Sequence, residues 1–166
     1  MAWSSKARAF WPLLATAFLT DCATKQIAVE HLAPAYTPHE VLGEWLRFVL
    51  AYNRNAAMSI SLGSGARPLL VAVALAMIGV LWVWYRRTER RDWMTAAALG
   101  LIAGGALGNL IDRIRWSRGV VDFIDVGVGA TRFPTFNVAD AAITCGAVWL
   151  VWRFGRSHRG SEQAAA

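Results

Sequence analysis

The sequence predicts an α-helical integral membrane protein, with four transmembrane helices and a small extracytoplasmic β-sheet. Composition is the first indication, because 56% of the 166 residues are hydrophobic and 17% are charged, whereas about a quarter are charged in soluble domains. Mean hydropathy is +0.37. Four apolar segments also approach the ~20 residues that a helix needs to cross hydrocarbon. No polar linker divides the chain, so we expect a single membrane domain over residues 1–166.

The four predicted spans cover residues 9–28, 68–85, 94–111 and 138–152, each within a few residues. The second reads "PLLVAVALAMIGVLWVWY" and the third reads "MTAAALGLIAGGALGNLI", and both are predominantly apolar. The fourth is the shortest. We therefore expect a bundle of four helices with short connections on one side of the membrane and longer ones on the other.

Basic residues indicate how the bundle is oriented. They precede the first span, fill the loop "RRTERRD" between the second and third, and follow the fourth. Cytoplasmic loops carry an excess of Lys and Arg, so both termini are expected in the cytoplasm. Because the basic residues flank apolar runs, the net charge of +6 does not predict nucleic-acid binding. Tryptophans predicted at the cytoplasmic ends are Trp11, Trp82, Trp84, Trp93, Trp149 and Trp152.

The outer side is expected to hold two longer segments, 29–66 and 112–137. In the first, Leu46 to Tyr52 is predicted to be a strand that ends at the turn "NRN". In the second, "GVVDFIDVGVG" is a further strand-like run. Together these runs predict a small sheet that rests on the outer face of the helices.

Polar side chains on three spans are predicted to lie at similar depths. With a rise of 1.5 Å per residue, Asp140 lies roughly 18 Å above the inner edge of its span, Asp21 about 17 Å and Asn109 about 23 Å. Ionisable groups inside a membrane are costly and are functional candidates by default. The agreement in depth predicts a shared polar cavity that opens toward the outer leaflet.

Helical spacing groups several of these side chains. Asp21 and Lys25 in "DCATK" stand at i and i+4, so they can form an ion pair that neutralises both groups, and such a pair can also brace a site. In "GNLIDR", Asn109, Asp112 and Arg113 share one helix face.

Three acids leave alternatives open. Asn137 and Asp140 have the spacing of an N-cap and its N3 partner, so a capping pair is one interpretation of "FNVAD" and a functional acid is the other. Asp122 and Asp125 in "GVVDFIDV" point to opposite faces of a strand. Only one of these two can face the cavity, and periodicity does not choose between them.

The available side chains favour carboxylate chemistry. None of the three histidines lies in a span, so metal sites and histidine-based triads are poorly supplied. Two carboxylates that share a poorly solvated site hold one proton between them, and such a pair can activate water against a peptide carbonyl. We expect Asp140 to form the pair with one acid of "VDFID", with no metal and no cofactor.

Five short motifs then point to a family. In order they are "DCATK", "NRNAAMS", "GGALGNLIDR", "VVDFID" and "FNVADAAI", spread over most of the chain. In this order and with four spans around them, the chain resembles the bacterial lipoprotein signal peptidase family, also called signal peptidase II. One departure is "NAAM", Asn55 to Met58, where that family usually has Gly-Ala-Ala-Phe.

The resemblance implies an aspartyl endopeptidase of the bacterial inner membrane, with its active site toward the periplasmic face. It would remove signal peptides from diacylglyceryl-modified prolipoproteins by cleaving before the lipidated cysteine. Its partners would be these lipid-modified substrates and membrane lipids, and it would act as a monomer, with a flexible outer loop over the substrate. The catalytic dyad would be Asp122 and Asp140. The substrate-binding or supporting residues would be Asp21, Lys25, Asn53, Asn109, Arg113 and Asn137.

A small proton-coupled transporter subunit is the alternative. Four spans with acids at membrane depth fit such a protein. The two long outer segments and the position of the polar groups toward one side do not fit it well.

Overall fold

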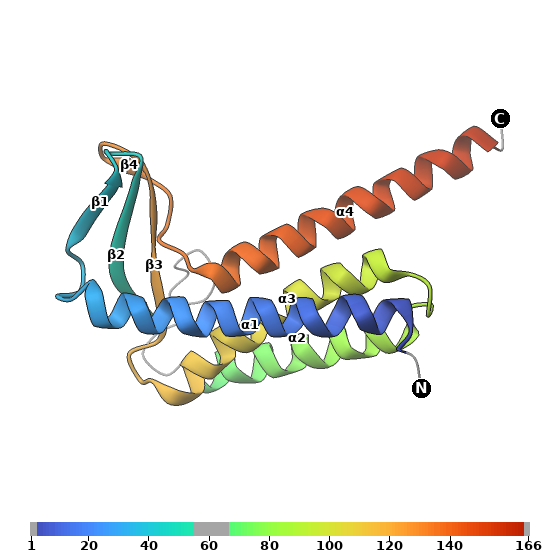
Figure 1. The fold of residues 1–166 in the computed structure, drawn as a ribbon, viewed down its shortest axis with the longest axis horizontal. Coiled ribbons are helices and arrows are strands. Elements are labelled where there is room, and N and C mark those ends of the chain that lie inside the picture. Colours follow the sequence, from blue (N-terminus) through green and yellow to red (C-terminus); the bar gives the residue numbers. More distant parts are fainter. Residues whose placement is uncertain (1–2, 55–66, 165–166) are drawn as a thin grey trace.

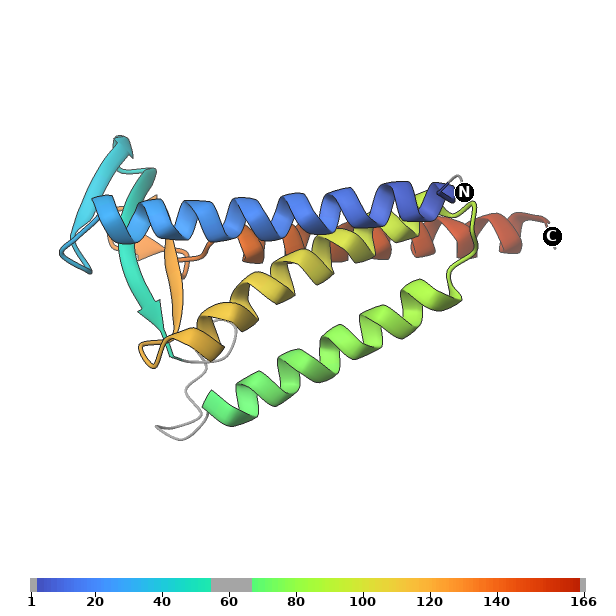
Figure 2. The same cartoon turned by 60° about the horizontal axis from the view of Figure 1, so that its bottom comes forward.

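The computed structural model describes residues 3–54 and 67–164. Helices form most of the molecule, and a small sheet lies at one end of them (Figure 1). Both termini lie at the opposite end in both views (Figures 1 and 2). The elements, in chain order, are α1 (Ser5–His31), β1 (Pro38–Leu42), β2 (Leu46–Asn53), α2 (Arg67–Arg87), α3 (Trp93–Arg115), β3 (Val120–Val128), β4 (Thr131–Arg132) and α4 (Val138–Ala164).

Helix α3 is the centre of the bundle and packs against α1, α2 and α4 (Figure 2). Small residues allow the closest of these approaches. A Cβ added at Gly104 would lie 2.5 Å from the carbonyl oxygen of Leu14, and one added at Gly108 would overlap the carboxylate of Asp21. Glycine at these positions lets α1 and α3 approach closely enough for side chains of α1 to reach the polar face of α3.

Three of the four predicted spans are confirmed as long and apolar enough to cross a membrane. They are Arg67–Arg87, Trp93–Arg115 and Val138–Arg156. The first predicted span, residues 9–28 in α1, is not among these three helices. Asp21 and Lys25 lower the apolarity of α1, and both side chains are buried inside the bundle.

The end of the bundle that holds the termini is fixed by polar and aromatic contacts. Lys6 Nζ donates to the carbonyl oxygens of Tyr85, at 3.0 Å, and Thr88, at 2.7 Å, near the end of α2. The rings of Phe10 and Tyr85 stack with their centroids 4.0 Å apart. A cation at a helix C-terminus compensates the partial negative charge of the free carbonyls, so Lys6 ties α1 to the end of α2.

The sheet is antiparallel, with strand order β1-β2-β3-β4. The predicted strands at Leu46–Tyr52 and in "GVVDFIDVGVG" are confirmed as β2 and β3. Strands β1 and β4 were not predicted. In the central pair Ala51 lies opposite Asp122, and beyond β4 the backbone of Phe136 bonds to that of Ile124. These pairings hold the middle of β3 beside the start of α4.

Candidate active site

Asp122 and Asp140 face one cavity of about 560 Å³. Asp122 comes from β3 and is 2% exposed, whereas Asp140 lies in the first turn of α4. Asp125 is directed elsewhere, and its carboxylate binds the Arg132 guanidinium at 2.7 Å. The predicted alternation along the strand therefore holds, and Asp122 is the acid that lines the cavity with Asp140.

Asparagine amides connect the two carboxylates. Asn137 Nδ2 donates to Asp122 Oδ1 at 2.7 Å and to Asn109 Oδ1 at 3.1 Å. Asn109 Nδ2 in turn donates to Asp140 Oδ1 at 2.8 Å, and Asn53 Nδ2 donates to Asp122 Oδ2 at 3.1 Å. Each carboxylate thus has an amide donor that fixes its plane. The amides come from β2, α3 and the residue before α4, so the fold has to be complete for this geometry to form.

The capping interpretation of "FNVAD" is also confirmed. The Asp140 N–H donates to Asn137 Oδ1 at 2.9 Å, and the Asn137 N–H donates to Asp140 Oδ2 at 3.2 Å. This reciprocal pair is a capping box. Capping and a position in the cavity are therefore not exclusive, because Asp140 uses one oxygen for the cap and the other for Asn109.

Lys25 stands at the centre of a buried ionic cluster. Its Nζ lies 2.7 Å from Asp21 Oδ2, 3.1 Å from Asp112 Oδ2 and 2.9 Å from Asn109 Oδ1. The predicted i, i+4 pair is present, and it also braces the site, because Asn109 is the residue that donates to Asp140. A lysine is only a donor. Lys25 therefore requires the Asn109 oxygen to face it and directs the amide nitrogen toward the aspartate.

The same cluster holds the backbone beside each cavity aspartate. Asp21 Oδ1 accepts from the Ala139 N–H at 2.8 Å, and Asp112 Oδ2 accepts from the Val121 N–H at 3.1 Å. Each donor peptide belongs to the residue directly before one of the two aspartates. From its position in "GNLIDR", Asp112 was expected to fix the exit of its span and the sheet above it. Its bond to the Val121 N–H in β3 is a contact of this kind.

Arg113 adds a positive charge to the cavity. Its Nη1 donates to the Asn109 carbonyl oxygen at 3.1 Å, and its side chain lines the cavity with both aspartates. A guanidinium has several donors in a fixed plane, so it can hold a substrate carbonyl or a developing oxyanion.

Burial changes the proton affinity of Asp122. Desolvation, and then the charge of Asp140, raise the pKa of Asp122 to about 7, while the bonds from Asn53 and Asn137 act in the opposite direction. A carboxyl group with this pKa holds a proton in a large share of molecules at neutral pH. The pair can therefore present one acid and one base at the same time.

The rest of the cavity wall is mostly apolar. Side chains from α2, α3, α4 and the segment after β4 line it, so the cavity can accept a ligand with a polar reacting group and an apolar remainder. The aromatic residues after β4 carried no motif and were missed in the sequence. The apolar lining includes Leu70, Val73, Met77, Phe133, Phe136 and Ile143.

All eight residues predicted for the site contribute to this cavity or to its supporting network of bonds. The predicted loop over the substrate lies outside the described residues, as do Asn55 and Met58.

The chain is similar to known proteins over most of its length. The Signal peptidase (SPase) II family matches residues 13–155. The chain is 40% identical over 143 residues to the lipoprotein signal peptidase of Xylella fastidiosa (strain M12), and the match covers 84% of each protein. It is 38% identical over 153 residues to the lipoprotein signal peptidase of Coxiella burnetii (strain Dugway 5J108-111), covering 89% of this chain and 92% of that protein.

Solved structures with the same fold are membrane enzymes. One, described as "Bacterial membrane enzyme structure by the in meso method at 2.3 A resolution", has a TM-score of 0.79 and 25% identity, and covers 88% of this chain and 87% of its own. A second, at 1.9 Å resolution, has a TM-score of 0.75 and 26% identity, with 86% and 89% covered.

Proposed function

The chain belongs to the signal peptidase II family, and from this premise we propose which of its residues carry out the reaction. Family membership makes it an aspartic peptidase that removes signal peptides from prolipoproteins. These relationships are to peptidases and do not support the transporter alternative. We assign the catalytic dyad to Asp122 and Asp140. The observation that supports this assignment is that two carboxylates from different elements face one cavity and are joined through Asn137 and Asn109.

The raised pKa of Asp122 suggests how the dyad divides its roles. Ionised Asp140 takes a proton from a water molecule, and the hydroxide formed attacks the scissile carbonyl carbon. Asp122 gives its proton to the carbonyl oxygen, which yields a tetrahedral intermediate. When that intermediate collapses, the C–N bond breaks, the amine takes the proton from Asp140, and Asp122 recovers its own.

Supporting residues keep the dyad in position. Asn53 and Asn137 orient Asp122, and Asn109 orients Asp140. Arg113 is the positive group proposed to stabilise the oxyanion or hold a substrate carbonyl. Asp21 and Lys25 act through the backbone of α4 and through Asn109. Neither a metal nor a cofactor enters this mechanism.

We further propose that α1 is the fourth span. Its two charged side chains at membrane depth form an ion pair inside the bundle, which lowers the cost of burying them. The loop "RRTERRD" and both termini would then face the cytoplasm, and the sheet and dyad would face the periplasm. Reporters fused to the two termini test this orientation, and a periplasmic signal from either one would contradict it.

The proposed substrate is a prolipoprotein whose cysteine carries diacylglycerol, cut directly before that cysteine. Apolar lining residues would contact the acyl chains, and the scissile bond would lie beside the dyad. We propose that the chain acts as a monomer.

The substrate is tested with purified protein and a matched pair of precursors, one diacylglyceryl-modified and one unmodified. We expect cleavage of the modified precursor to be faster by roughly 10²-fold or more, because remote binding energy positions the reacting bond. The cleavage rate is read by mass spectrometry of the released peptide. Equal rates on the two precursors would contradict the proposed lipid requirement while leaving the dyad untouched.

A further inference from the structure

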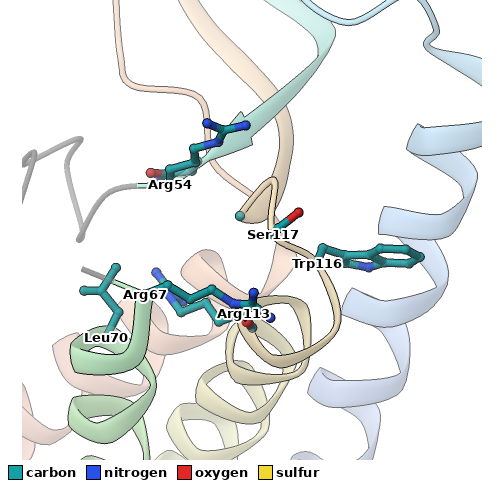
Figure 3. Close-up of a pocket in the computed structure, with 8 residues that line it drawn as sticks. Arg54, Arg67, Leu70, Arg113, Trp116 and Ser117 are labelled. Atoms are coloured by element: carbon teal, nitrogen blue, oxygen red, sulfur yellow. Dashed lines mark hydrogen bonds between the residues drawn. The ribbon is translucent and has the colours of Figure 1, made fainter. Parts of the chain in front are cut away.

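A second cavity of about 260 Å³ adjoins the proposed catalytic one (Figure 3). It lies where α2 begins and α3 ends, at the end of the bundle that carries the sheet. Asn53, Leu70 and Arg113 line both cavities. The complete lining, among the described residues, is Asn53, Arg54, Arg67, Leu70, Arg113, Trp116, Ser117 and Gly119.

The charge of this cavity is positive. Arg67 and Arg113 lie side by side on one wall, and Arg54 stands across from them with its guanidinium turned away from the pair (Figure 3). No carboxylate is present among the described lining residues. Arg113 faces Asp122 and Asp140 in the neighbouring cavity, but Arg67 has no acidic partner in the described part of the chain.

Arg67 is held in a fixed position. Its Nε donates to the Arg113 carbonyl oxygen at 2.7 Å, and its Nη2 donates to the Ile114 carbonyl oxygen at 2.8 Å. No described residue accepts from its Nη1. The guanidinium is thus oriented by the end of α3 and retains donor capacity, which is what preorganised anion recognition requires.

Another arginine strengthens the positive field. Arg118 stacks over the rings of Tyr52, at 4.5 Å, and Trp116, at 4.8 Å. Its Nε is buried and finds no acceptor among the described residues. Arg67 and Arg118 thus bring to this region positive charge that no described carboxylate pairs with.

The surroundings of the cavity indicate which kind of anion it can bind. Below it, α2 presents an apolar surface, on which Leu69 is 56% exposed. Only 11% of the most apolar stretch of α2 is buried inside the protein, so lipid tails are its expected neighbours. A ligand with a phosphate at the arginines and acyl chains along α2 matches both surfaces.

We propose that this cavity binds the phosphate headgroup of an anionic phospholipid, with Arg67 as the main contact and the acyl chains along α2. Basic pockets between transmembrane helices bind such headgroups by charge-assisted hydrogen bonds. The bound lipid would border the substrate cavity at Leu70 and Arg113. This inference does not depend on the assignment of the dyad, and binding rather than cleavage is its test.

The experiment titrates short-chain phosphatidylglycerol, phosphatidylcholine and inorganic phosphate onto the full-length protein in a neutral detergent. We expect phosphatidylglycerol to bind roughly tenfold more tightly than phosphatidylcholine, and Arg67→Gln to remove that preference. Arg115→Gln is the matched control, because Arg115 lies at the same end of α3 but does not line the cavity. It should keep the preference.

A second variant covers the case in which Arg67→Gln fails to fold. Ser117→Trp fills the cavity without removing a charge, and it should weaken phosphatidylglycerol binding by a similar factor. The proposal is overturned if the wild type does not prefer the anionic lipid, or if the folded variants at Arg67 and Ser117 retain the preference. Inorganic phosphate that binds as tightly as the lipid would overturn the membrane lipid as the source.

Discussion

The Asp140 carboxylate makes two kinds of contact. One oxygen completes the capping box of α4, and the other accepts from Asn109 inside the cavity. The spacing of "FNVAD" predicts the cap, and the depth within the span predicts the functional acid. The cap is present, and it is compatible with the proposed catalytic role, since a carboxylate fixed by its own helix terminus would need little further ordering before it reacted.

The choice between Asp122 and Asp125 could not be made from strand periodicity. Alternation places the two side chains on opposite faces, but the face that meets the helices depends on contacts distant in sequence. Those contacts include the pairing of Ile124 with Phe136 and the bond from Asn137. Only the family resemblance indicated Asp122 before the structure did.

The pH dependence of cleavage tests the role of Asp122. Its raised pKa means that the proton is bound below about pH 7 and lost above it, so the cleavage rate should fall as the pH rises through about 7. Asn53→Ala removes a bond that lowers this pKa, and the fall should move to higher pH. Single-turnover cleavage between about pH 5 and 9 measures both profiles. A rate that is constant across this range would argue against Asp122 as the acid.

The same shift affects stability. The folded pKa of Asp122 lies above the unfolded value near 4, so the folded state binds this proton more tightly. The contribution of Asp122 to stability is therefore present below about pH 4 and is lost as the pH rises through about 7.

Lys25 should be required for stability as well as for activity. Lys25→Met leaves the carboxylates of Asp21 and Asp112 buried without their cation, and breaking such a cluster costs about 3–5 kcal/mol. Denaturant unfolding in detergent measures the loss. Glu40→Gln is the control, because Glu40 is exposed in its pair with Arg47 and its removal should cost less than about 1 kcal/mol. Equal losses for the two variants would contradict the bracing role of Lys25.

Among the elements, α3 determines how the site assembles. It contacts each of the other helices. It also carries Asn109, which donates to Asp140, and Asp112, which accepts from the Val121 N–H directly before Asp122. The sequence predicted its span and its polar face. Sequence spacing reports neighbours within one helix only, so the bond from Lys25 to Asp112 across two helices could not be predicted.

The strands also differ in whether the sequence predicts them. Strands β2 and β3 have buried residues and apolar patterns, and they were predicted. Strand β1 is exposed along its whole length and β4 has two residues, so neither has a pattern that a sequence can show. Helix α1 was predicted as a span. Its buried charges make it less apolar than the three helices that qualify by composition.

The close packing of α1 against α3 can be tested by substituting a glycine at their contact. A Cβ at Gly108 would overlap the Asp21 carboxylate, so Gly108→Ala should displace the group that holds the first turn of α4. We expect a loss of roughly 1–3 kcal/mol in unfolding free energy together with reduced cleavage. Gly79→Ala in α2 is the matched control, because no atom lies within 4 Å of its added Cβ. Similar changes in unfolding free energy and cleavage for the two variants would contradict the need for the close approach of α1 and α3 at Gly108.

In the molecule as a whole, the helices and the sheet contribute differently to the site. The helices bury a polar cluster whose exposure to lipid would cost free energy, and the sheet brings Asp122 to that cluster. The depths and the helical spacing of the polar side chains predict the buried cluster. The position of Asp122 depends on how the sheet packs against the helices, and this packing could not be predicted from the sequence.

The account is tested most directly by the cleavage of a diacylglyceryl-modified precursor by three folded variants, Asp122→Asn, Asp140→Asn and Asp125→Asn. Loss of either dyad carboxylate should slow single-turnover cleavage by roughly 10²–10⁴-fold while substrate binding persists. Asp125→Asn changes only the pair with Arg132 and should retain most activity. Normal cleavage by the Asp122→Asn or the Asp140→Asn protein would contradict the proposed dyad.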